Sequence, residues 1–338
     1  MTVRISLALQ GGGAHGAFTW GVLDRLLEDG GLEIAALSGT SAGAMNAAAC
    51  KVGLMENGRQ GARDSLARLW REIRATGNDA MNPWLKVGMS YASAANQIVE
   101  DMLSFSPMGI MAQMVSPYAT GAFRDHPLTQ IVARFDFTAV CAAEGPPIFV
   151  AATNVRTGRV RVFDRSDLTP EAVLASACLP TVFPAVVIDG EAYWDGGYVA
   201  NPPLWPLYDP ALPDDIVIVQ INPDRREEVP MSPVDIQSRI NEISFNASLM
   251  GELRAIAFVK RLIAEGRVER GRMKDVALHL IADDAVMGEL SATTKLLPSD
   301  ALIERLHTAG RTAADRFLAG HGAALGRGGS VDLKALLA

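Results

Sequence analysis

The chain has 338 residues, of which 49% are hydrophobic, and its formal net charge is −7. This apolar fraction is sufficient for a sizeable buried core, which excludes a disordered protein. The acidic balance argues against nucleic-acid binding, which requires a basic surface, and gives no general attraction to anionic lipid. The length suggests about two domains, but no repeat, charge run or long linker marks a boundary before residue 323.

The N-terminal segment predicts a strand, a glycine-rich loop and a helix. Residues 3–9 alternate and are apolar enough for a core strand. Residues 10–16 contain three consecutive glycines, and a helical apolar pattern continues from Phe18 to Leu27. The first strand has only seven residues with Arg4 among them, which is too short for the hydrophobic region of a signal peptide.

The glycine-rich loop has two interpretations. Gly11, Gly13 and Gly16 match the dinucleotide-binding pattern G-x-G-x-x-G between a strand and a helix. That function also requires an acidic residue near the end of the second strand, whereas Glu33 stands at its start. Consecutive glycine amides can instead stabilise a tetrahedral oxyanion, and we favour this interpretation.

A second strand, at 32–37, leads into the motif Gly39-Thr40-Ser41-Ala42-Gly43. The pattern G-x-S-x-G holds a nucleophilic serine on a sharp turn between a strand and a helix. A helix is predicted from Ala42 to Met55 with a break near Asn57-Gly58, and its N-terminus favours negative charge beside the serine. The alternative is a tight turn with a capping serine.

The next helix carries five arginines around Trp70. Their spacings of three and four residues place several on one side, which suits either a solvated helix face or a patch at a membrane surface. We favour the solvated face. The arginines are Arg59, Arg63, Arg68, Arg71 and Arg74.

A methionine-rich insert is expected at residues 80–123, where three prolines divide short helical pieces. Methionine adapts to irregular apolar shapes, so this insert is either a helical cap that binds an acyl chain or a core filler. Its methionines include Met89, Met102, Met108, Met111 and Met114, and its aromatic residues include Trp84, Tyr91, Phe105 and Tyr118.

The C-terminal half contributes an acidic turn and a long helix. Asp195-Gly196-Gly197 is typical of a turn. Residues 233–265 predict an amphipathic helix that packs on the sheet or presents a homodimer face. Its apolar positions include Ile236, Ile240, Ile243, Leu249, Leu253 and Ile256. The Gly-rich residues after 323 predict a linker to a short C-terminal segment.

Cysteines and histidines predict no further site. Cys50, Cys141 and Cys178 are too widely spaced for a disulfide framework or a zinc site, and each is expected to be a small core residue. In a Ser–acid–His triad His279 would follow Asp195, but its surroundings predict the interior of a strand.

No stretch reaches the length of a membrane span, so a cytoplasmic protein is expected, free or peripheral to a membrane.

Three ordered elements carry a family resemblance: the loop at 11–16, the motif at 39–43 and the turn at 195–197. The chain resembles the patatin-like phospholipases over about residues 3–285. This resemblance implies a three-layer α/β/α sandwich with a mostly parallel sheet, as one catalytic domain at 1–322 followed by residues 323–338. Further matching stretches are Ser116-Pro117-Tyr118, Asn222-Pro223 and Asn241-Glu242-Ile243-Ser244-Phe245-Asn246.

The resemblance also implies chemistry. Ser41 would be the nucleophile and Asp195 its base, in a Ser–Asp dyad that needs no histidine, metal or cofactor. The amides of Gly11, Gly12 and Gly13 would form the oxyanion hole.

The loop departs from the family pattern at one position. His15 stands where the family usually has Arg or Lys, so a fixed charge would become one that titrates near pH 6.5. His15 is expected either to order the loop as a hydrogen-bond donor or merely to start the helix, with weak electrostatic help as the lesser alternative. Gly16 is expected to support the loop.

The implied activity is hydrolysis of a lipid carboxyl ester through an acyl-Ser41 intermediate. Two alternatives stay open: acyl transfer to an alcohol on the same dyad, and a silent lipid-binding or protein-binding relative. The expected partner is a lipid or another acyl ester.

Overall fold

The computed structural model describes residues 2–80, 126–180, 182–226, 229–231, 233–269, 271–290, 294–295 and 298–337. The insert predicted at 80–123 lies, apart from residue 80, outside the described residues, so its role as a cap stays a prediction. Within the described residues, none of the helices is both long enough and apolar enough to cross a membrane.

A mixed sheet forms the centre of the molecule, with the strand order β5-β6-β3-β2-β1-β7-β8 and β4 paired with β3. Strands β3, β2, β1, β7 and β8 are parallel, whereas β4, β5 and β6 run antiparallel to their neighbours. The strands are β1 Val3–Leu9, β2 Leu32–Gly39, β3 Ile148–Asn154, β4 Val160–Asp164, β5 Val186–Ile188, β6 Glu191–Asp195, β7 Asp215–Val219 and β8 Ala277–Ile281.

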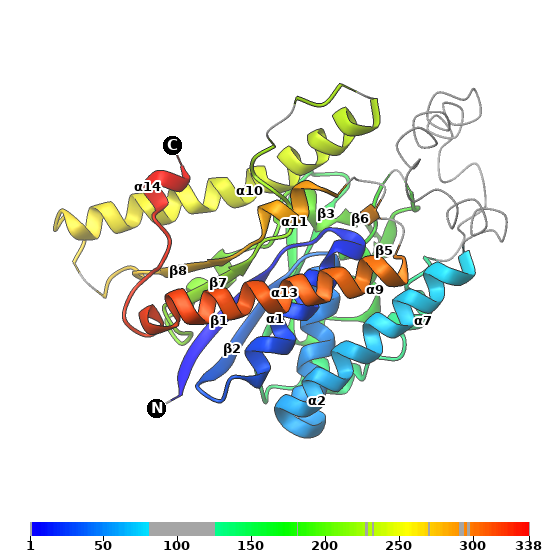
Figure 1. Ribbon diagram of the computed structural model, residues 1–338, viewed down its shortest axis with the longest axis horizontal. Coiled ribbons are helices and arrows are strands. Elements are labelled where there is room, and N and C mark those ends of the chain that lie inside the picture. Colours follow the sequence, from blue (N-terminus) through cyan, green and yellow to red (C-terminus); the bar gives the residue numbers. More distant parts are fainter. Residues whose placement is uncertain are drawn as a thin grey trace.

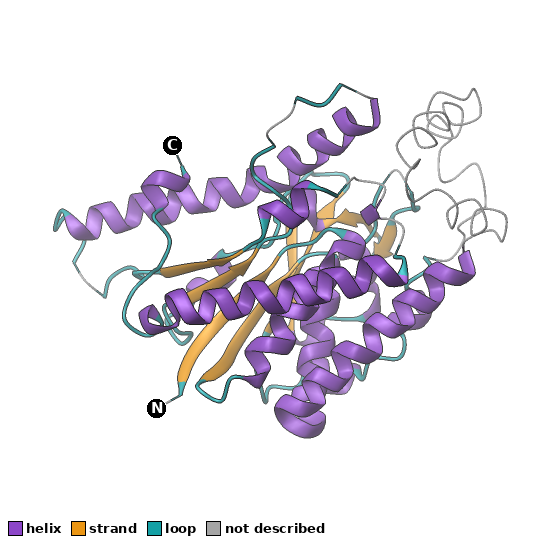
Figure 2. Cartoon of the chain, viewed as in Figure 1, coloured by secondary structure: helices purple, strands orange, loops and turns teal. Residues whose placement is uncertain are grey.

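Helices cover both faces of this sheet, as Figures 1 and 2 show. Helices α1, α2 and α13 lie on one face, and α10 and α14 lie on the other, which confirms the three-layer α/β/α architecture. The α-helices are α1 Gly16–Glu28, α2 Ala42–Ala80, α7 Thr129–Val132, α8 Phe137–Cys141, α9 Pro170–Ser176, α10 Pro233–Ala264, α11 Asp284–Gly288, α13 Asp300–His321 and α14 Leu333–Leu336. Short 3-10 helices are η1 Gly13–His15, η2 Arg165–Asp167, η3 Gly196–Tyr198, η4 Trp205–Tyr208 and η5 Gly322–Ala324.

The strand period of two separates the core into two layers. In β1, Leu7 and Leu9 join the cluster under α1, α2 and α13, whereas Ala8 joins the cluster under α10. In β7, Val217 and Ile218 divide in the same way. A parallel sheet buried on both faces needs such nearly continuous apolar strands.

Helix α2 follows the predicted course, including its break. Asn57 and Gly58 have non-helical backbone angles that divide the element into two helices. Beyond the break, Arg59 donates to the carbonyl oxygens of Asp29 and Leu32. Arg63, Arg68 and Arg74 form ion pairs with acidic residues, so these charges are balanced within the chain.

The structure corrects one part of the prediction that helix α10 packs on the sheet. Leu249 and Leu253 are buried against the sheet, but Ile236, Ile240 and Ile243 are 42%, 52% and 55% exposed. These three isoleucines lie in the N-terminal half of the helix, before the packed leucines. The sheet therefore holds only part of this helix, and the homodimer alternative stays a prediction.

The glycine-rich residues after 323 run along the sheet edge. The amides of Ser330 and Val331 donate to the carbonyl of Leu278 in β8. Leu333 and Leu336 then pack on the cluster beneath α10. Contacts with β8 and the core therefore hold this segment, although the sequence predicts that it begins as a linker.

The cysteines mostly behave as predicted. Cys50 and Cys178 are completely buried, and burial raises the pKa of each thiol to about 12. The structure corrects the prediction of a core position for Cys141, which is only partly buried at the edge of the core.

Candidate active site

Ser41 lies on a strained turn between β2 and α2. Its φ of 55° is in the left-handed region, which residues other than glycine rarely occupy. A Cβ at Gly43 would lie 2.1 Å from the Leu9 oxygen, and one at Gly39 would lie 2.6 Å from the Gly43 backbone. The glycines on each side of the serine are therefore required by close packing of three backbone segments.

Neighbouring side chains hold this turn in place. The Ser41 N–H donates to Ser176 Oγ of α9 at 2.9 Å. The Thr40 hydroxyl donates to the Ala200 carbonyl at 2.7 Å. Ser41 is 7% exposed, so the turn and its supports are largely shielded from water.

Asp195 ends strand β6 and is 1% exposed. Its N–H donates to the Cys178 carbonyl at 2.7 Å, and its Oδ1 accepts the Gly197 N–H at 2.7 Å. The other oxygen, Oδ2, is buried and has no partner in hydrogen-bond geometry within the part of the chain that the structure describes, although Ser41 is close enough to lower the carboxyl pKa. Burial outweighs both neighbours and raises the pKa of Asp195 to about 7.

The glycine loop packs directly on the serine turn, since a Cβ at Gly11 would lie 2.7 Å from the Ser41 Cβ. The Gly11 N–H already donates to Asn201 Oδ1 at 2.6 Å, so it differs from the free oxyanion donor that we predicted. Within the described residues, the amides of Gly12 and Gly13 have no hydrogen-bond partner. Both amides are therefore available as donors in the described structure.

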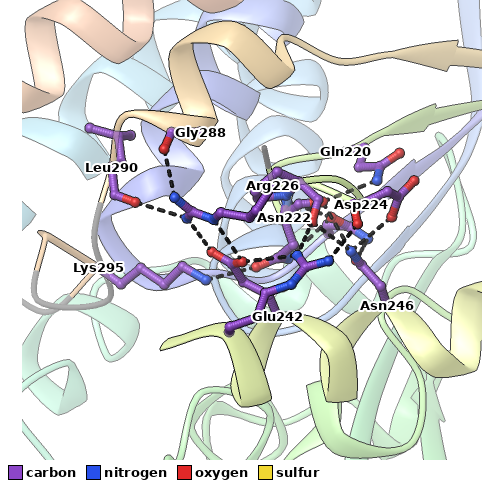
Figure 3. A network of polar contacts seen from close by, with 12 residues as sticks. Gln220, Asn222, Asp224, Arg226, Glu242, Asn246, Gly288, Leu290 and Lys295 are labelled. Atoms are coloured by element: carbon purple, nitrogen blue, oxygen red, sulfur yellow. Dashed lines mark hydrogen bonds and ion pairs between the residues drawn. The ribbon is translucent and has the colours of Figure 1, made fainter. Parts of the chain in front are cut away.

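A buried network of amide side chains supports the loop from below. Gln10 Oε1 accepts the backbone N–H groups of Ile221 and Asn222, and Gln10 Nε2 donates to Asn201 O and Asn246 Oδ1. Figure 3 shows the part of this network around Asn222. Gln10, Asn201, Asn222 and Asn246 all lie at or below 5% exposure, so their polar groups depend on each other for hydrogen bonds.

His15 is not a charged group at this site. It is 2% exposed, and its Nε2 lies 2.7 Å from Thr294 Oγ1. Burial, followed by the charges of Lys295 and Arg226, lowers the pKa of His15 to about 3. His15 is therefore neutral at physiological pH, which corrects the expectation of a charge that titrates near pH 6.5. Gly16 allows close packing, because its Cβ would lie 2.6 Å from the Ala42 Cβ.

The positive charges near the loop come from elsewhere in the chain. Lys295 Nζ donates to Asn222 Oδ1 at 2.9 Å. Arg226 pairs with the buried Glu242, which also pairs with Arg239 (Figure 3 labels Arg226 and Glu242). No motif in the sequence marks Lys295, so the sequence analysis missed it. The sequence marked Asn222 only within a matching stretch.

His279 takes part in a different cluster. Its Nε2 lies 3.0 Å from Asp215 Oδ1 and its Nδ1 lies 2.9 Å from Ser330 Oγ. Among the described residues, no histidine forms a hydrogen bond with Ser41 or Asp195. The described geometry therefore does not support the Ser–acid–His layout.

A cavity of about 440 Å³ lies at the other end of β2, lined by residues such as Leu32, Ile34 and Met55. Ser41 is not among its lining residues. Across the described ranges, no group of three or more His, Cys, Asp or Glu side chains could hold a metal ion.

The model of the patatin-like phospholipase family matches residues 7–208, which include the glycine loop, the serine turn and Asp195. The chain belongs to this family. Membership confirms the resemblance seen in the sequence and supports activity of the lipid-ester hydrolase type. A search of the curated proteins finds no match.

Two solved structures are similar to this patatin-like chain. VipD from Legionella pneumophila aligns at 15% identity and a TM-score of 0.43, over 95% of this chain and 67% of that chain. ExoU, in its heterodimeric complex with SpcU from the type III secretion system of Pseudomonas aeruginosa, aligns at 18% identity and a TM-score of 0.30. The second alignment covers 94% of this chain and 59% of that chain.

Proposed function

We propose that this chain is a serine acyl hydrolase that cleaves lipid carboxyl esters, with Ser41 as nucleophile and Asp195 as its base. One observation carries the proposal. The serine on the strained turn adjoins a buried carboxyl group whose Oδ2 has, among the described residues, no partner in hydrogen-bond geometry. A nucleophile beside a base that can accept its proton is the arrangement required for covalent acyl transfer.

The proposed reaction has two halves. Ser41 Oγ attacks the ester carbonyl carbon while its proton passes to Asp195 Oδ2. The carbonyl oxygen becomes an oxyanion, which accepts hydrogen bonds from the Gly12 and Gly13 amides. The alcohol leaves with the proton from Asp195, and an acyl-serine remains. Water then attacks the acyl carbon while one of its protons passes to Asp195. The bond between this carbon and Ser41 Oγ breaks, Asp195 returns the proton to Oγ, and the acid and the free serine are released.

The environment of Asp195 suits this role. A general base works best when its pKa lies near the working pH, because it is then ionised and still basic enough to accept a proton. An ordinary aspartate with a pKa of about 3.9 is a weak base for a hydroxyl group. The pKa of about 7 that burial gives to Asp195 brings it into the useful range.

The test combines active-site labelling with turnover. A fluorophosphonate probe should label Ser41, and the purified chain should release fatty acid from phospholipid or lysophospholipid. Ser41→Ala should abolish both signals. Ser65→Ala, at a buried serine on α2, should retain both. Labelling and turnover that persist in Ser41→Ala would reject the proposal.

A further inference from the structure

The segment at Thr294 and Lys295 lies against the glycine loop. A Cβ at Gly13 would lie 2.3 Å from the Lys295 carbonyl oxygen, and Thr294 contacts His15. The Lys295 side chain then reaches Asn222, where its Nζ donates to Oδ1 at 2.9 Å. Lys295 is partly exposed as a residue, but its ammonium group is desolvated at this contact.

The chemistry of its partners determines the orientation of the Asn222 amide. An ammonium group has only donors, so it must face Asn222 Oδ1. Asn222 Nδ2 then donates to the Gly11 carbonyl oxygen at 2.8 Å. These contacts join Lys295, Asn222 and Gly11 into one series of hydrogen bonds, in which each group donates to the next in the direction from Lys295 to Gly11.

The next group in this series of hydrogen bonds is the Gly12 amide. In a planar trans peptide the C=O and the N–H point in opposite directions, so a Gly11 carbonyl directed at Asn222 directs the Gly12 N–H away from it. Hydrogen bonds in such a series polarise one another, and a positive charge at one end strengthens the last donor.

We propose that Lys295 is a positioning residue for ester hydrolysis, which orients and polarises the Gly12 N–H through Asn222 and the Gly11–Gly12 peptide. This inference rests on the proposed function, in which Gly12 stabilises the oxyanion. It assigns the cationic support of the loop to a residue from a distant part of the sequence, and His15 stays neutral.

The surroundings of Lys295 make this support sensitive to pH. Burial and the nearby charge of Arg226 lower the pKa of Lys295 to about 8, while the charge of Glu242 opposes them. His15 also faces this cluster and is neutral. As pH rises above about 8, Lys295 loses its charge and the Gly12 donor weakens, so kcat should fall.

The test uses full-length variants with a soluble ester at saturating concentration. Lys295→Met should lower kcat by about 10-fold, which is less than the roughly 10²- to 10³-fold cost of losing an oxyanion donor, and should leave KM within about 2-fold. Lys295→Arg, which keeps its charge at high pH, should retain kcat within about 3-fold and remove the fall above about pH 8.

Two further variants separate charge from folding. Lys295→Gln keeps a donor for Asn222 without the charge, so it should behave like Lys295→Met. It also provides a neutral variant if Lys295→Met does not fold. Lys51→Met removes a buried lysine elsewhere in the chain, which donates to the Ala142 carbonyl, and should leave kcat unchanged.

Unchanged kcat in Lys295→Gln or Lys295→Met, or an alkaline fall that persists in Lys295→Arg, would overturn the inference. The proposed function fails separately, because it predicts that the wild-type chain turns over esters and is labelled at Ser41. A labelled, active wild type with an unaffected Lys295→Gln variant rejects only the role of Lys295.

Discussion

Replacing Asp195 with asparagine should abolish turnover and stabilise the folded chain. Asp195 is 1% exposed, and its Oδ2 lacks a partner in hydrogen-bond geometry among the described residues. Burying a charge in this way destabilises the native state. The asparagine side chain would keep an acceptor for the Gly197 N–H, which now donates to Oδ1 at 2.7 Å, and it would carry no charge at any pH.

Proton linkage gives the size of the stability difference between Asp195→Asn and the wild type. Between pH 3.8 and about 7 the folded chain keeps the Asp195 proton while the unfolded chain releases it. The free energy of unfolding therefore falls as pH rises through this window, by about 1.4 kcal/mol per pH unit. The whole window is worth about 4 kcal/mol, so Asp195→Asn should gain up to this amount over the wild type above about pH 7 and little below about pH 4.

Urea unfolding of both proteins at several pH values from about 4 to 9 measures this difference. Other titrating groups are present in both chains, so their effects cancel. Glu252 provides a matched control, because burial also raises its pKa to about 7. Relative to the wild type, Glu252→Gln should also gain stability as pH rises, and it should keep its turnover. A stability difference between Asp195→Asn and the wild type that stays constant from about pH 4 to 8 would refute the reasoning.

Three other predictions test the supports of the site. Gly43→Ala should destabilise the chain by more than about 2 kcal/mol in thermal unfolding, because its Cβ would meet the Leu9 oxygen at 2.1 Å; wild-type stability would contradict the close approach. Ser176→Ala should lower kcat with little change in KM, because it removes the partner of the Ser41 N–H, and an unchanged kcat would assign Ser176 a purely structural role. His279→Ala should lower stability by about 2 kcal/mol and leave kcat within about 2-fold, whereas loss of turnover in a folded variant would restore the triad alternative.

The parts that could be predicted from the sequence are those that neighbouring residues decide. The strand at 3–9 and the break at Asn57-Gly58 occur where local pattern and turn chemistry placed them. The family match confirms the resemblance, which rested on three short motifs in order. Ser41 on a strand-to-helix turn follows from the same local pattern, because backbone angles depend on adjacent residues.

The surroundings of those motifs could not be read in this way. The Gly11 amide is taken by Asn201, 190 residues away. Exposure of Ile240 depends on how far α10 extends beyond the sheet, and an apolar pattern is the same whether or not a surface covers it.

The sequence by itself determined the family, the layered fold and the turn that carries Ser41, since local backbone preferences and apolar periodicity produce them. Only the tertiary structure decided the electrostatics of the site. Burial gives Asp195 a pKa of about 7 and keeps His15 neutral, and Lys295 reaches the loop from a distant segment. Desolvation and hydrogen bonding depend on which residues meet in space, and that is decided when the whole chain packs.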